Sequence, residues 1–400
     1  MSGLNFLNKL LDGVDVEWLS LGELGDFIRG NGLQKKDFVE SGFPAIHYGQ
    51  IYTRYGLSAD KTFTYVLPEL ANKLRKAQKN DLLLATTSEN DEDVVKPLAW
   101  LGDNVAISGD MMLFRHEQNV KYLAYFFQSE IFQTQKMKYI TGAKVRRVSS
   151  GDLSKIKIPI PCSNNPEKSL AIQSEIVRIL DKFTALTAEL TAELNMRKKQ
   201  YNYYRDQLLS FEEGEVEWKT LGDLGENLDS KRKPITSGLR EAGSIPYYGA
   251  SGIVDYVKDY IFDGDFLLIS EDGANLLARN TPIAFSISGK SWVNNHAHVI
   301  KFDSYAERRY VEYYLNSIDL SPYISGAAQP KLNKKNLESI RIPNPSPEDK
   351  ERIVSILDKF DALTNSINEG LPREIELRQK QYEYYRDLLF SFPRPETASN

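Results

Sequence analysis

The sequence predicts two mixed α/β (α+β) domains joined by two long helices that form an antiparallel coiled coil, with a pseudo-twofold internal duplication of the chain. Three observations predict this fold class. Segments recur in the same order in both halves, long stretches have heptad spacing, and short apolar runs punctuated by Gly, Asn and Asp lie between them. The length of 400 residues agrees, because one domain usually takes roughly 100–200 residues.

The duplication is clearest in two segments. IVRILDKFTALT (176–187) recurs as IVSILDKFDALT (353–364), and 10 of 12 residues are identical. RKKQYNYYRDQLLSF (197–211) recurs as RQKQYEYYRDLLFSF (378–392), and 11 of 15 are identical. Shorter repeats pair residues 16–25 with 216–225, 139–143 with 323–327, and 153–159 with 337–343. We call these repeated segments the frame.

The interiors between the frame segments, residues 26–138 and 226–322, barely align with each other. We interpret the frame as one structural or partner-binding device used twice, and the interiors as two different recognition tasks. Uneven divergence of a duplicated fold is the alternative interpretation. That interpretation does not explain why the flanking frame segments have diverged so much less than the interiors.

Both interiors have the pattern of short strands followed by a helix. Apolar runs at residues 81–86, 265–270 and 292–302 predict strands, because turn-forming residues bound them. Amphipathic stretches follow at 121–135 and 306–317. Each interior then passes through a polar loop into an Ile-x-Ile-Pro strand, and these loops are residues 141–152 and 325–336.

Each long helix begins with a capping signal. Asn165 precedes Pro166, and Ser346 precedes Pro347, so each pair offers a cap and a favourable first helical residue. Apolar residues at positions 172, 176, 179, 183, 186 and 190 then form a heptad seam. We expect each helix to cover ~45 residues, or roughly 65 Å. The segment Gly370-Leu371-Pro372 should kink or interrupt the second helix.

Residues 187–194 read TAEL-TAEL, a tandem tetrapeptide. Four residues are close to one helical turn, so one copy more or fewer changes the helix length by ~6 Å and nearly preserves its face. An ordinary Ala/Glu/Leu helix segment is the plainer interpretation of the motif by itself. Between two recognition units we interpret it as a spacer that sets a distance. Its marker residues are Thr187, Leu190, Thr191 and Leu194.

These patterns divide the chain into four parts. Residues 1–157 form the first α/β domain, 158–214 the first long helix with the spacer, 215–341 the second domain, and 342–400 the second long helix with a C-terminal tail.

The composition is that of a folded protein, with 41% hydrophobic and 26% charged residues. A single cysteine, no apolar run of about 18 residues and no signal-peptide pattern predict a cytoplasmic protein that does not span a membrane. The net charge is −5, and no large block of the chain is basic. Binding to DNA must therefore use local clusters of cations.

Such clusters occur at comparable places in both halves. Lys and Arg neutralise phosphates, and Arg or Gln can read base edges, so we take these residues and their polar neighbours as candidate DNA contacts. A solvated surface role is the alternative for any one of them. The candidates are Lys35, Lys36, Gln50, Tyr52, Arg54, Lys144, Arg146, Arg147, Lys231, Arg232, Lys233, Arg240, Tyr247, Tyr248, Ser251, Lys331, Lys334 and Lys335.

Catalytic motifs are absent from the sequence. It has no P-loop, no Gly-x-Ser-x-Gly elbow and no Asn/Asp-Pro-Pro-aromatic motif of an amino-methyltransferase. One cysteine and four histidines exclude a Cys/His zinc site, unless carboxylates supply most of the ligands. His296 and His298 could bind a metal from one face of a strand, but structural hydrogen bonding is the favoured interpretation.

The frame resembles the specificity subunit of type I restriction–modification enzymes, and the type IC branch in particular. The resemblance rests on residues 165–194, 197–211, 213–222 and 370–393, and on the alternation of variable unit and long helix. The interiors match this family only in general layout.

The resemblance implies a non-catalytic subunit whose two target recognition domains each read one half of a bipartite, asymmetric DNA site. It implies that the coiled coil sets the gap between the half-sites and docks two methyltransferase subunits, which two motor/nuclease subunits then join. S-adenosylmethionine, ATP and Mg²⁺ are expected on those partners, and no cofactor or metal on this chain. Localisation in the bacterial cytoplasm, at the nucleoid through DNA, is also implied.

Two other functions stay open at this point. One is a coiled-coil scaffold whose α/β modules bind proteins, which the matched basic clusters disfavour. The other is a stand-alone DNA-modifying enzyme, which the missing catalytic motifs disfavour. The target bases cannot be read from these loops.

Overall fold

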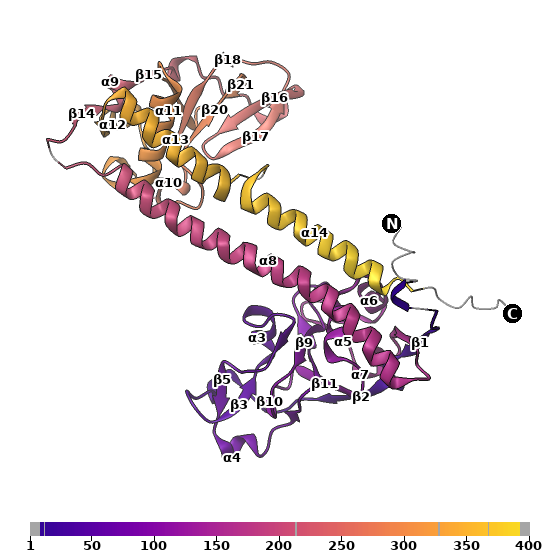
Figure 1. Ribbon diagram of the computed structural model, residues 1–400. Helices are drawn as coiled ribbons and strands as arrows, with labels where there is room; N and C mark the ends of the chain where they lie inside the picture. Colours follow the sequence, from indigo (N-terminus) through magenta and orange to yellow (C-terminus); the bar gives the residue numbers. More distant parts are fainter. Residues whose placement is uncertain (1–8, 12, 213, 327–328, 367, 393–400) are drawn as a thin grey trace. The chain divides into compact units, whose positions relative to one another are not determined.

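The computed structural model describes residues 9–11, 13–212, 214–326, 329–366 and 368–392 (Figure 1). The chain divides into two compact units. Unit 1 comprises Met1–Glu189 with Ile375–Asn400, and unit 2 comprises Leu190–Glu374. Each unit holds one α/β domain together with parts of both long helices, which confirms the predicted fold class. The predicted division at residues 157, 214 and 341 is based on the frame and stays a prediction.

Unit 1 contains two main sheets. The larger has the strand order β2 (Gly25–Arg29), β11 (Met111–His116), β7 (Leu82–Ala85), β9 (Lys96–Trp100) and β4 (Ser58–Ala59). The smaller has the order β5 (Thr64–Val66), β3 (Phe43–Ile46), β10 (Val105–Ile107) and β6 (Lys76–Ala77).

Strand β7 is buried along its whole length, as its unbroken apolar run predicts. Leu82 and Leu84 lie in one hydrophobic core, and Leu83 and Ala85 lie in another. Because successive side chains of a strand point to opposite faces, the larger sheet of unit 1 is covered on both sides.

Unit 2 repeats the central part of this arrangement. One sheet has the order β15 (Glu226–Asn227), β22 (Ala297–Lys301), β19 (Phe266–Ser270) and β20 (Ala284–Ile287). The other has the order β17 (Gly252–Val257), β16 (Ala242–Gly249), β21 (Lys290–Val293) and β18 (Phe262–Asp263). Strand β19 is buried throughout and corresponds to β7.

The predicted strand at residues 292–302 is two strands, β21 and β22, in different sheets. Asn294 separates them, and its side chain accepts a hydrogen bond from the backbone N–H of His296 at 2.8 Å. An Asn side chain that bonds the backbone two residues later forms a turn, and this turn signal lies inside the apolar run.

Frame strands close each unit in the same register. β1 (Val16–Ser20) pairs antiparallel with β13 (Lys157–Pro161), and β14 (Glu217–Thr220) pairs antiparallel with β23 (Arg341–Asn344). Trp18 lies opposite Pro159, and Trp218 lies opposite Pro343. The strands before and after each interior therefore bring the two ends of that interior together.

The amphipathic stretches are helices, as predicted. Unit 1 has α5 (Val120–Gln128) and α6 (Glu130–Lys136), and unit 2 has α11 (Tyr305–Ser317). The first long helix is α8 (Pro166–Leu208), and the second is divided into α13 (Pro347–Thr364) and α14 (Gly370–Phe390). Figure 1 shows α5 beside the first half of α8 and close to β9.

One aspartate of the frame anchors helix α5 of unit 1. Asp181 of α8 accepts hydrogen bonds from Lys121 Nζ at 2.5 Å and from the Tyr125 hydroxyl at 2.7 Å. Both donors come from α5, one turn apart. The carboxylate therefore ties the variable interior to the repeated helix.

The equivalent aspartate makes the same connection in unit 2. Asp358 of α13 accepts hydrogen bonds from Arg309 Nε at 3.0 Å and from the Tyr313 hydroxyl at 2.6 Å. These donors are again four residues apart, on α11. The interiors have diverged, but a cation and a tyrosine at this spacing are retained.

Both long helices begin where the capping signals predict. The Asn165 side chain accepts a hydrogen bond from the Lys168 N–H at 3.1 Å, and the Ser346 side chain accepts one from the Asp349 N–H at 3.1 Å. The expected interruption of the second helix is also found, and α14 begins at Gly370 with a φ of +73°. A Cβ there would lie 2.3 Å from the nearest carbonyl oxygen, so only glycine fits.

The predicted heptad seam is buried only in its first turns. Ile172 and Ile176 lie in the core of unit 1, and so does Leu180, which the seam does not include. Leu186 is 37% exposed, contrary to the prediction. The reason is that the first turns of α8 pack on the α/β core, whereas no described residue of α8 after Leu180 is buried.

Two aromatic contacts between the frame copies have the same geometry. In unit 1, Phe183 stacks on Tyr385 with ring centroids 5.2 Å apart. In unit 2, Phe360 stacks on Tyr204 with ring centroids 5.7 Å apart. The two phenylalanines occupy equivalent frame positions, and so do the two tyrosines. In each unit, therefore, a helix residue of one frame copy packs on a residue of the other copy.

The end of α14 also contributes to the core of unit 1. Phe390 is fully buried, and its ring lies 5.1 Å from that of Tyr122 and 5.6 Å from that of Phe126. Leu209 is buried in the core of unit 2 and is the equivalent residue of the first copy. Among the helices of the described residues, none combines the length and the apolar character needed to cross a membrane.

The buried His116 predicts a stability of unit 1 that depends on pH. Burial lowers the pKa of His116 to about 4, and its Nδ1 accepts a hydrogen bond from the Gln118 N–H at 3.1 Å. Because the unfolded state binds a proton first as the pH falls, we expect a loss of about 2 kcal/mol between pH 7.5 and pH 5. Proteolysis in urea, with fragments of unit 1 identified by mass spectrometry, measures this loss. The H116N variant keeps an acceptor but does not titrate, and an equal loss in that variant would contradict the assignment to His116.

Candidate nucleic-acid interface

The polar loop at the end of each interior has the same hydrogen bonds in both units. In unit 1, the backbones of Thr141 and Arg147 exchange two hydrogen bonds of 2.9 Å. In unit 2, the backbones of Ser325 and Lys331 exchange two of 2.8 Å. In each loop the hydroxyl also donates to the carbonyl oxygen of the cationic residue, at 3.2 Å. Arg147 and Lys331 therefore occupy equivalent positions.

Each of these cations lies beside the segment that follows the central strand of its sheet. β12 (Arg146–Arg147) pairs with β8 (Thr87–Ser88), and Arg147 lies opposite Thr87. Lys331 forms an isolated bridge with Asp272. The predicted cation clusters at the two loops thus belong to one repeated structural feature.

Four further candidates of unit 1 are exposed. Lys35 and Lys36 lie in the short 3-10 helix η1 (Lys35–Asp37), Lys144 lies in the polar loop, and Arg54 lies with its guanidinium 5.3 Å from the ring centre of Phe63. No ion pair to any of these four cations is formed within the described residues. Their charges are available to an external anion.

Two other candidates of unit 1 bind groups inside the protein. Gln50 accepts a hydrogen bond from the backbone N–H of His47 at 2.9 Å and donates one to the Thr64 hydroxyl at 3.1 Å. The Tyr52 hydroxyl lies 3.0–3.3 Å from three backbone carbonyl oxygens, and burial raises the pKa of Tyr52 well above its usual range. These contacts favour a structural role, and DNA contact by either residue stays a prediction.

Arg146 has a carboxylate partner within the protein. Its Nε lies 2.8 Å from Asp91 Oδ1, and its Nη1 donates to the carbonyl oxygen of Gly142. Arg146 thus braces the polar loop, whereas its neighbour Arg147 does not take part in this ion pair.

The exposed candidates of unit 2 lie in three segments. Lys231 ends the 3-10 helix η3 (Asp229–Lys231), and Lys233 and Ser251 lie in loops. Lys334 and Lys335 begin α12 (Lys334–Glu338), where Lys334 Nζ lies 3.6 Å from Glu338 Oε1.

Arg240, Tyr247 and Tyr248 are more enclosed. Arg240 pairs with Asp255 at 3.0 Å, and its guanidinium lies 4.4 Å from the ring centre of Tyr247. Tyr247 is 1% exposed, and its hydroxyl accepts a hydrogen bond from the Ile235 N–H at 2.9 Å. The half-buried Tyr248 lies on the same strand, β16. A base contact by Tyr247 would require this packing to open.

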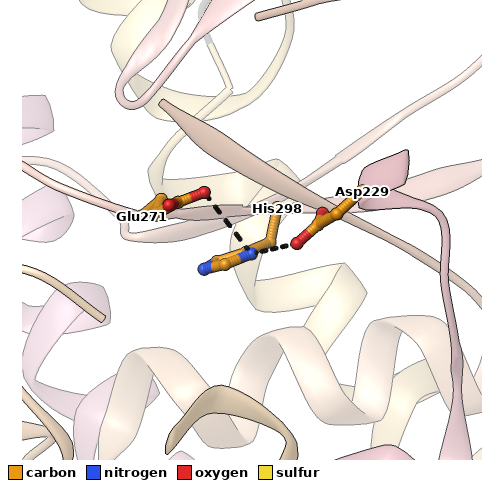
Figure 2. A group of neighbouring side chains, drawn as sticks. All are labelled: Asp229, Glu271 and His298. Carbon is orange, nitrogen blue, oxygen red and sulfur yellow. Dashed lines mark hydrogen bonds and ion pairs between the residues drawn. The ribbon is translucent and has the colours of Figure 1, made fainter. Parts of the chain in front are cut away.

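A compact polar cluster surrounds His298 in unit 2 (Figure 2). The Nδ1 of His298 lies 2.6 Å from Asp229 Oδ2 and 3.8 Å from Glu271 Oε2, and its Nε2 lies 2.7 Å from the carbonyl oxygen of Leu332. Both ring nitrogens thus face oxygen atoms of the protein.

Two cations complete the cluster. Arg232 Nη1 lies 2.7 Å from Glu271 and Nη2 lies 3.3 Å from Asp229, and Lys331 Nζ lies 3.1 Å from Glu271. Burial by itself raises the pKa of both carboxyl groups, but hydrogen bonds and the neighbouring positive charges lower the pKa of each overall. The Arg232 side chain is only 13% exposed and faces these carboxylates, so its position does not suit the predicted contact with DNA.

The same cluster is the candidate metal site of the described residues. Asp229, Glu271 and His298 each offer one ligand atom, and these atoms lie within 4.8 Å of one another. Arg232 and Lys331 already supply the positive charge that a metal ion would bring. His296 bonds Asp272 at 2.9 Å. Both histidines thus make the hydrogen bonds that the sequence interpretation favours, and the absence of a metal ion at them stays a prediction.

The sequence reasoning missed Arg29, which lies with Arg147 in the wall of a cleft of unit 1. The sequence does contain a signal that points to Arg29. The frame motif VEW-x-x-LG-x-LG, at 16–25 and 216–225, aligns Arg29 with Asp229 four residues after its end. An opposite charge at one position of two otherwise matched segments indicates a site where the units differ.

Comparisons with known proteins agree with this organisation. The family model described as "Type I restriction modification DNA specificity domain" matches residues 13–197 and 213–377. The specificity subunit of the Escherichia coli type I restriction enzyme EcoR124I/EcoR124II is 43% identical over 425 aligned residues, and the alignment covers 100% of both chains. The E. coli EcoprrI specificity subunit is 37% identical, with 92% of this chain and 93% of that protein covered.

Two solved structures share the fold. The S subunit of a type I restriction–modification system from M. genitalium has a TM-score of 0.58 and 16% identity, with 96% of this chain and 98% of that chain covered. A chain from a structural study of complex assembly and conformational transition of the type I R-M system has a TM-score of 0.56 and 15% identity, with 94% and 97% covered.

Removal of the Arg232 guanidinium from the cluster should destabilise unit 2. We expect R232Q to lower the free energy of unfolding of unit 2 by about 3–5 kcal/mol, because two buried carboxylates lose a partner. The matched control K231Q changes an exposed neighbour and should stay within about 0.5 kcal/mol. Urea unfolding followed in unit 2 measures both. EDTA should leave the wild-type curve unchanged, and a destabilisation by EDTA would instead indicate a structural metal ion.

Proposed function

The chain belongs to the type I restriction–modification DNA specificity family, and we propose that it is the specificity subunit of a type I restriction–modification complex. In this role each α/β domain is a target recognition domain that reads one half of a bipartite, asymmetric DNA site. The chain binds DNA but does not carry out the chemistry on it.

The observation that carries this proposal is the contrast between frame and interiors. The two domains have the same frame strands, aspartate anchors and aromatic contacts, and their sheets have equivalent strand orders apart from the extra edge strand β4 of unit 1. Their interiors nevertheless differ in sequence and in the charge at matched positions, as Arg29 and Asp229 show. A duplicated frame with unlike interiors suits a protein that presents two different DNA-reading surfaces to one shared machinery. Local cations on a chain of net charge −5 supply the contacts with phosphate.

The reaction itself belongs to partner subunits in this proposal. Two methyltransferase subunits with S-adenosylmethionine methylate adenine in the two half-sites, and two motor/nuclease subunits use ATP and Mg²⁺. The chain binds no cofactor of its own. The complex acts on DNA in the bacterial cytoplasm, at the nucleoid.

Two matched aromatic surfaces support docking of two identical partners. Tyr203 is 62% exposed and packs edge-on against Tyr204, and Tyr384 is 61% exposed and packs edge-on against Tyr385. Core packing does not explain why such exposed tyrosines are the same in both frame copies. Exposed tyrosines are enriched where proteins bind one another, so the repeated pair is a suitable anchor for a partner used twice.

The position of the tandem tetrapeptide supports its role as a spacer. The division between the two compact units falls between Glu189 and Leu190, inside residues 187–194. None of these eight residues is buried in either core. A change of length here therefore leaves both recognition domains intact.

A methylation map tests the proposal. The chain is expressed with a methyltransferase subunit of the same type of system in a host without adenine methylation, and modified adenine is located by sequencing genomic DNA. The expected result is a single asymmetric bipartite motif with a fixed gap. A stable complex of the two proteins that leaves no methylation would favour a scaffold that binds proteins. S-adenosylmethionine-dependent activity of the purified chain alone would favour a stand-alone enzyme.

Deletion of Thr191–Leu194 should shorten the gap in that motif by one to two base pairs and leave both half-sites unchanged. One tetrapeptide is ~6 Å of helix, against ~3.4 Å per base pair. The length-matched control T191A/L194A should keep the original gap. The same methylation map reads out both variants, and new letters within a half-site would refute the spacer role.

Tyr203 and Tyr384 should each contribute to one docking event. We expect Y203A and Y384A each to weaken the binding of one methyltransferase copy by about tenfold, as for an interface tyrosine. Calorimetric titration measures the two binding events. L239A is the control, because Leu239 is 76% exposed but lies in an interior. If both tyrosine variants bind two copies as tightly as L239A does, the docking surface lies elsewhere.

A further inference from the structure

The positions that form the cluster around His298 in unit 2 have equivalent positions in unit 1, where other residues stand. Strand pairing places Arg29 opposite Met112 in unit 1, where unit 2 has Asp229 beside His298. Thr86 follows strand β7 as Glu271 follows β19. The two carboxylates and the histidine of unit 2 thus correspond to an arginine, a threonine and a methionine.

The two units differ at this place in what fills the space. In unit 2, Arg232 and Lys331 form ion pairs with Glu271 here. In unit 1, a cleft of about 380 Å³ is found instead. Its lining residues are Phe27, Arg29, Thr86, Thr87, Met112, Thr141, Arg147, Val148, Ser149 and Ser150. The lining has two guanidinium groups and five hydroxyl groups, and it contains no carboxylate and no amide side chain.

The positive charge of this cleft is only partly paired within the unit, because Arg29 forms one long ion pair and Arg147 forms none within the described residues. Lys331 is paired with Glu271, but the equivalent Arg147 forms no ion pair and no side-chain hydrogen bond within the described residues. The Nε of Arg29 donates to the carbonyl oxygen of Gly109 at 2.9 Å. The nearest carboxylate to Arg29, that of Asp110, lies at 3.9 Å.

A buried hydroxyl in the wall of the cleft lacks a partner. Thr87 is only 7% exposed, and among the described residues its Oγ1 has no hydrogen bond. Buried polar side-chain atoms almost always have a partner, so an orphan in the wall of a cleft indicates a bound group that the cleft accommodates. The neighbouring Thr86 hydroxyl, in contrast, donates to the carbonyl oxygen of Asp110 at 3.1 Å.

We propose that this cleft binds a backbone phosphate of DNA in the half-site that unit 1 reads. Arg147 and Arg29 supply the charge, and Thr87 donates a hydrogen bond. A phosphate only accepts hydrogen bonds, which matches a lining that offers cations and hydroxyl donors but no acidic acceptor. Unit 2 lacks this phosphate site because its cations Arg232 and Lys331 already form ion pairs with its own carboxylates. The inference rests on the proposed function and adds that the two units hold the DNA backbone differently.

Neutralisation of single phosphates tests the site. The complex with its methyltransferase subunit is titrated with a DNA duplex that carries the mapped target, and each phosphate in turn is replaced by an uncharged methylphosphonate. One replacement in the half-site of unit 1 should weaken wild-type binding about tenfold. The same replacement should not further weaken R147Q, which has already lost the contact.

Variants separate this role from a structural one. R147Q should weaken binding about tenfold on every half-site sequence and lower the slope of log K against log salt by about 0.9. T87V should bind about threefold more weakly, although its fold is as stable as wild type or more so, because an unpaired hydroxyl is removed. K79Q removes an exposed cation of unit 1 that precedes β7, at the other end of that strand from Thr87, and should leave the response to each methylphosphonate unchanged.

Two results would overturn the proposal. The first is that R147Q binds DNA as wild type does. The second is that R147Q loses the preference for one base with an unchanged salt slope, which would make Arg147 a reader of a base edge. A wild-type complex without site-specific binding is a different failure, because it removes the proposed function and this inference together.

Discussion

Each compact unit depends on one repeated contact, the stacking of a phenylalanine from one frame copy on a tyrosine from the other. Phe183 with Tyr385 closes unit 1, and Phe360 with Tyr204 closes unit 2. Because the partners come from different copies, neither α/β domain is completed by its own half of the sequence. This reciprocity requires the two frame copies to match, and it explains why they stay alike. The interiors meet this frame at a few positions, such as Tyr122 and Phe126 against Phe390, and can differ elsewhere.

A second repeated contact attaches each interior to the frame and leaves the rest of the interior free to differ. Asp181 and Asp358 are identical frame residues, and each binds a tyrosine hydroxyl and a cation on a helix of the interior, α5 or α11. The sequence around those partners has diverged, but the contact persists. Away from the frame, equivalent places have opposite chemistry. Where unit 2 has Asp229 in an ion-pair network, unit 1 has Arg29 in an open, positively charged cleft. Shared attachment with unlike surfaces is what two different half-sites require.

Local patterns predicted much of the fold. The buried central strands, the capped starts of the long helices and the break before Gly370 follow from apolar runs, caps and glycine, which act over a few residues. Contacts between distant segments were not predictable in this way. Arg232 was a plausible DNA contact from its cationic neighbours, but its carboxylate partner Glu271 lies 39 residues away and encloses it. Tyr52 similarly meets carbonyl oxygens of later segments. The predicted DNA contacts at exposed cations remain predictions.

The most direct test of the reciprocal frame is hydrogen exchange on F183A and F360A. The account predicts that F183A raises exchange about tenfold in residues 378–390, because half-buried aromatic contacts hold this helix on unit 1. Exchange in residues 197–208 should stay at the wild-type level. F360A should show the converse pattern. If either change loosened both segments equally, or if neither segment responded, the claim that each unit is closed by the other frame copy would be contradicted.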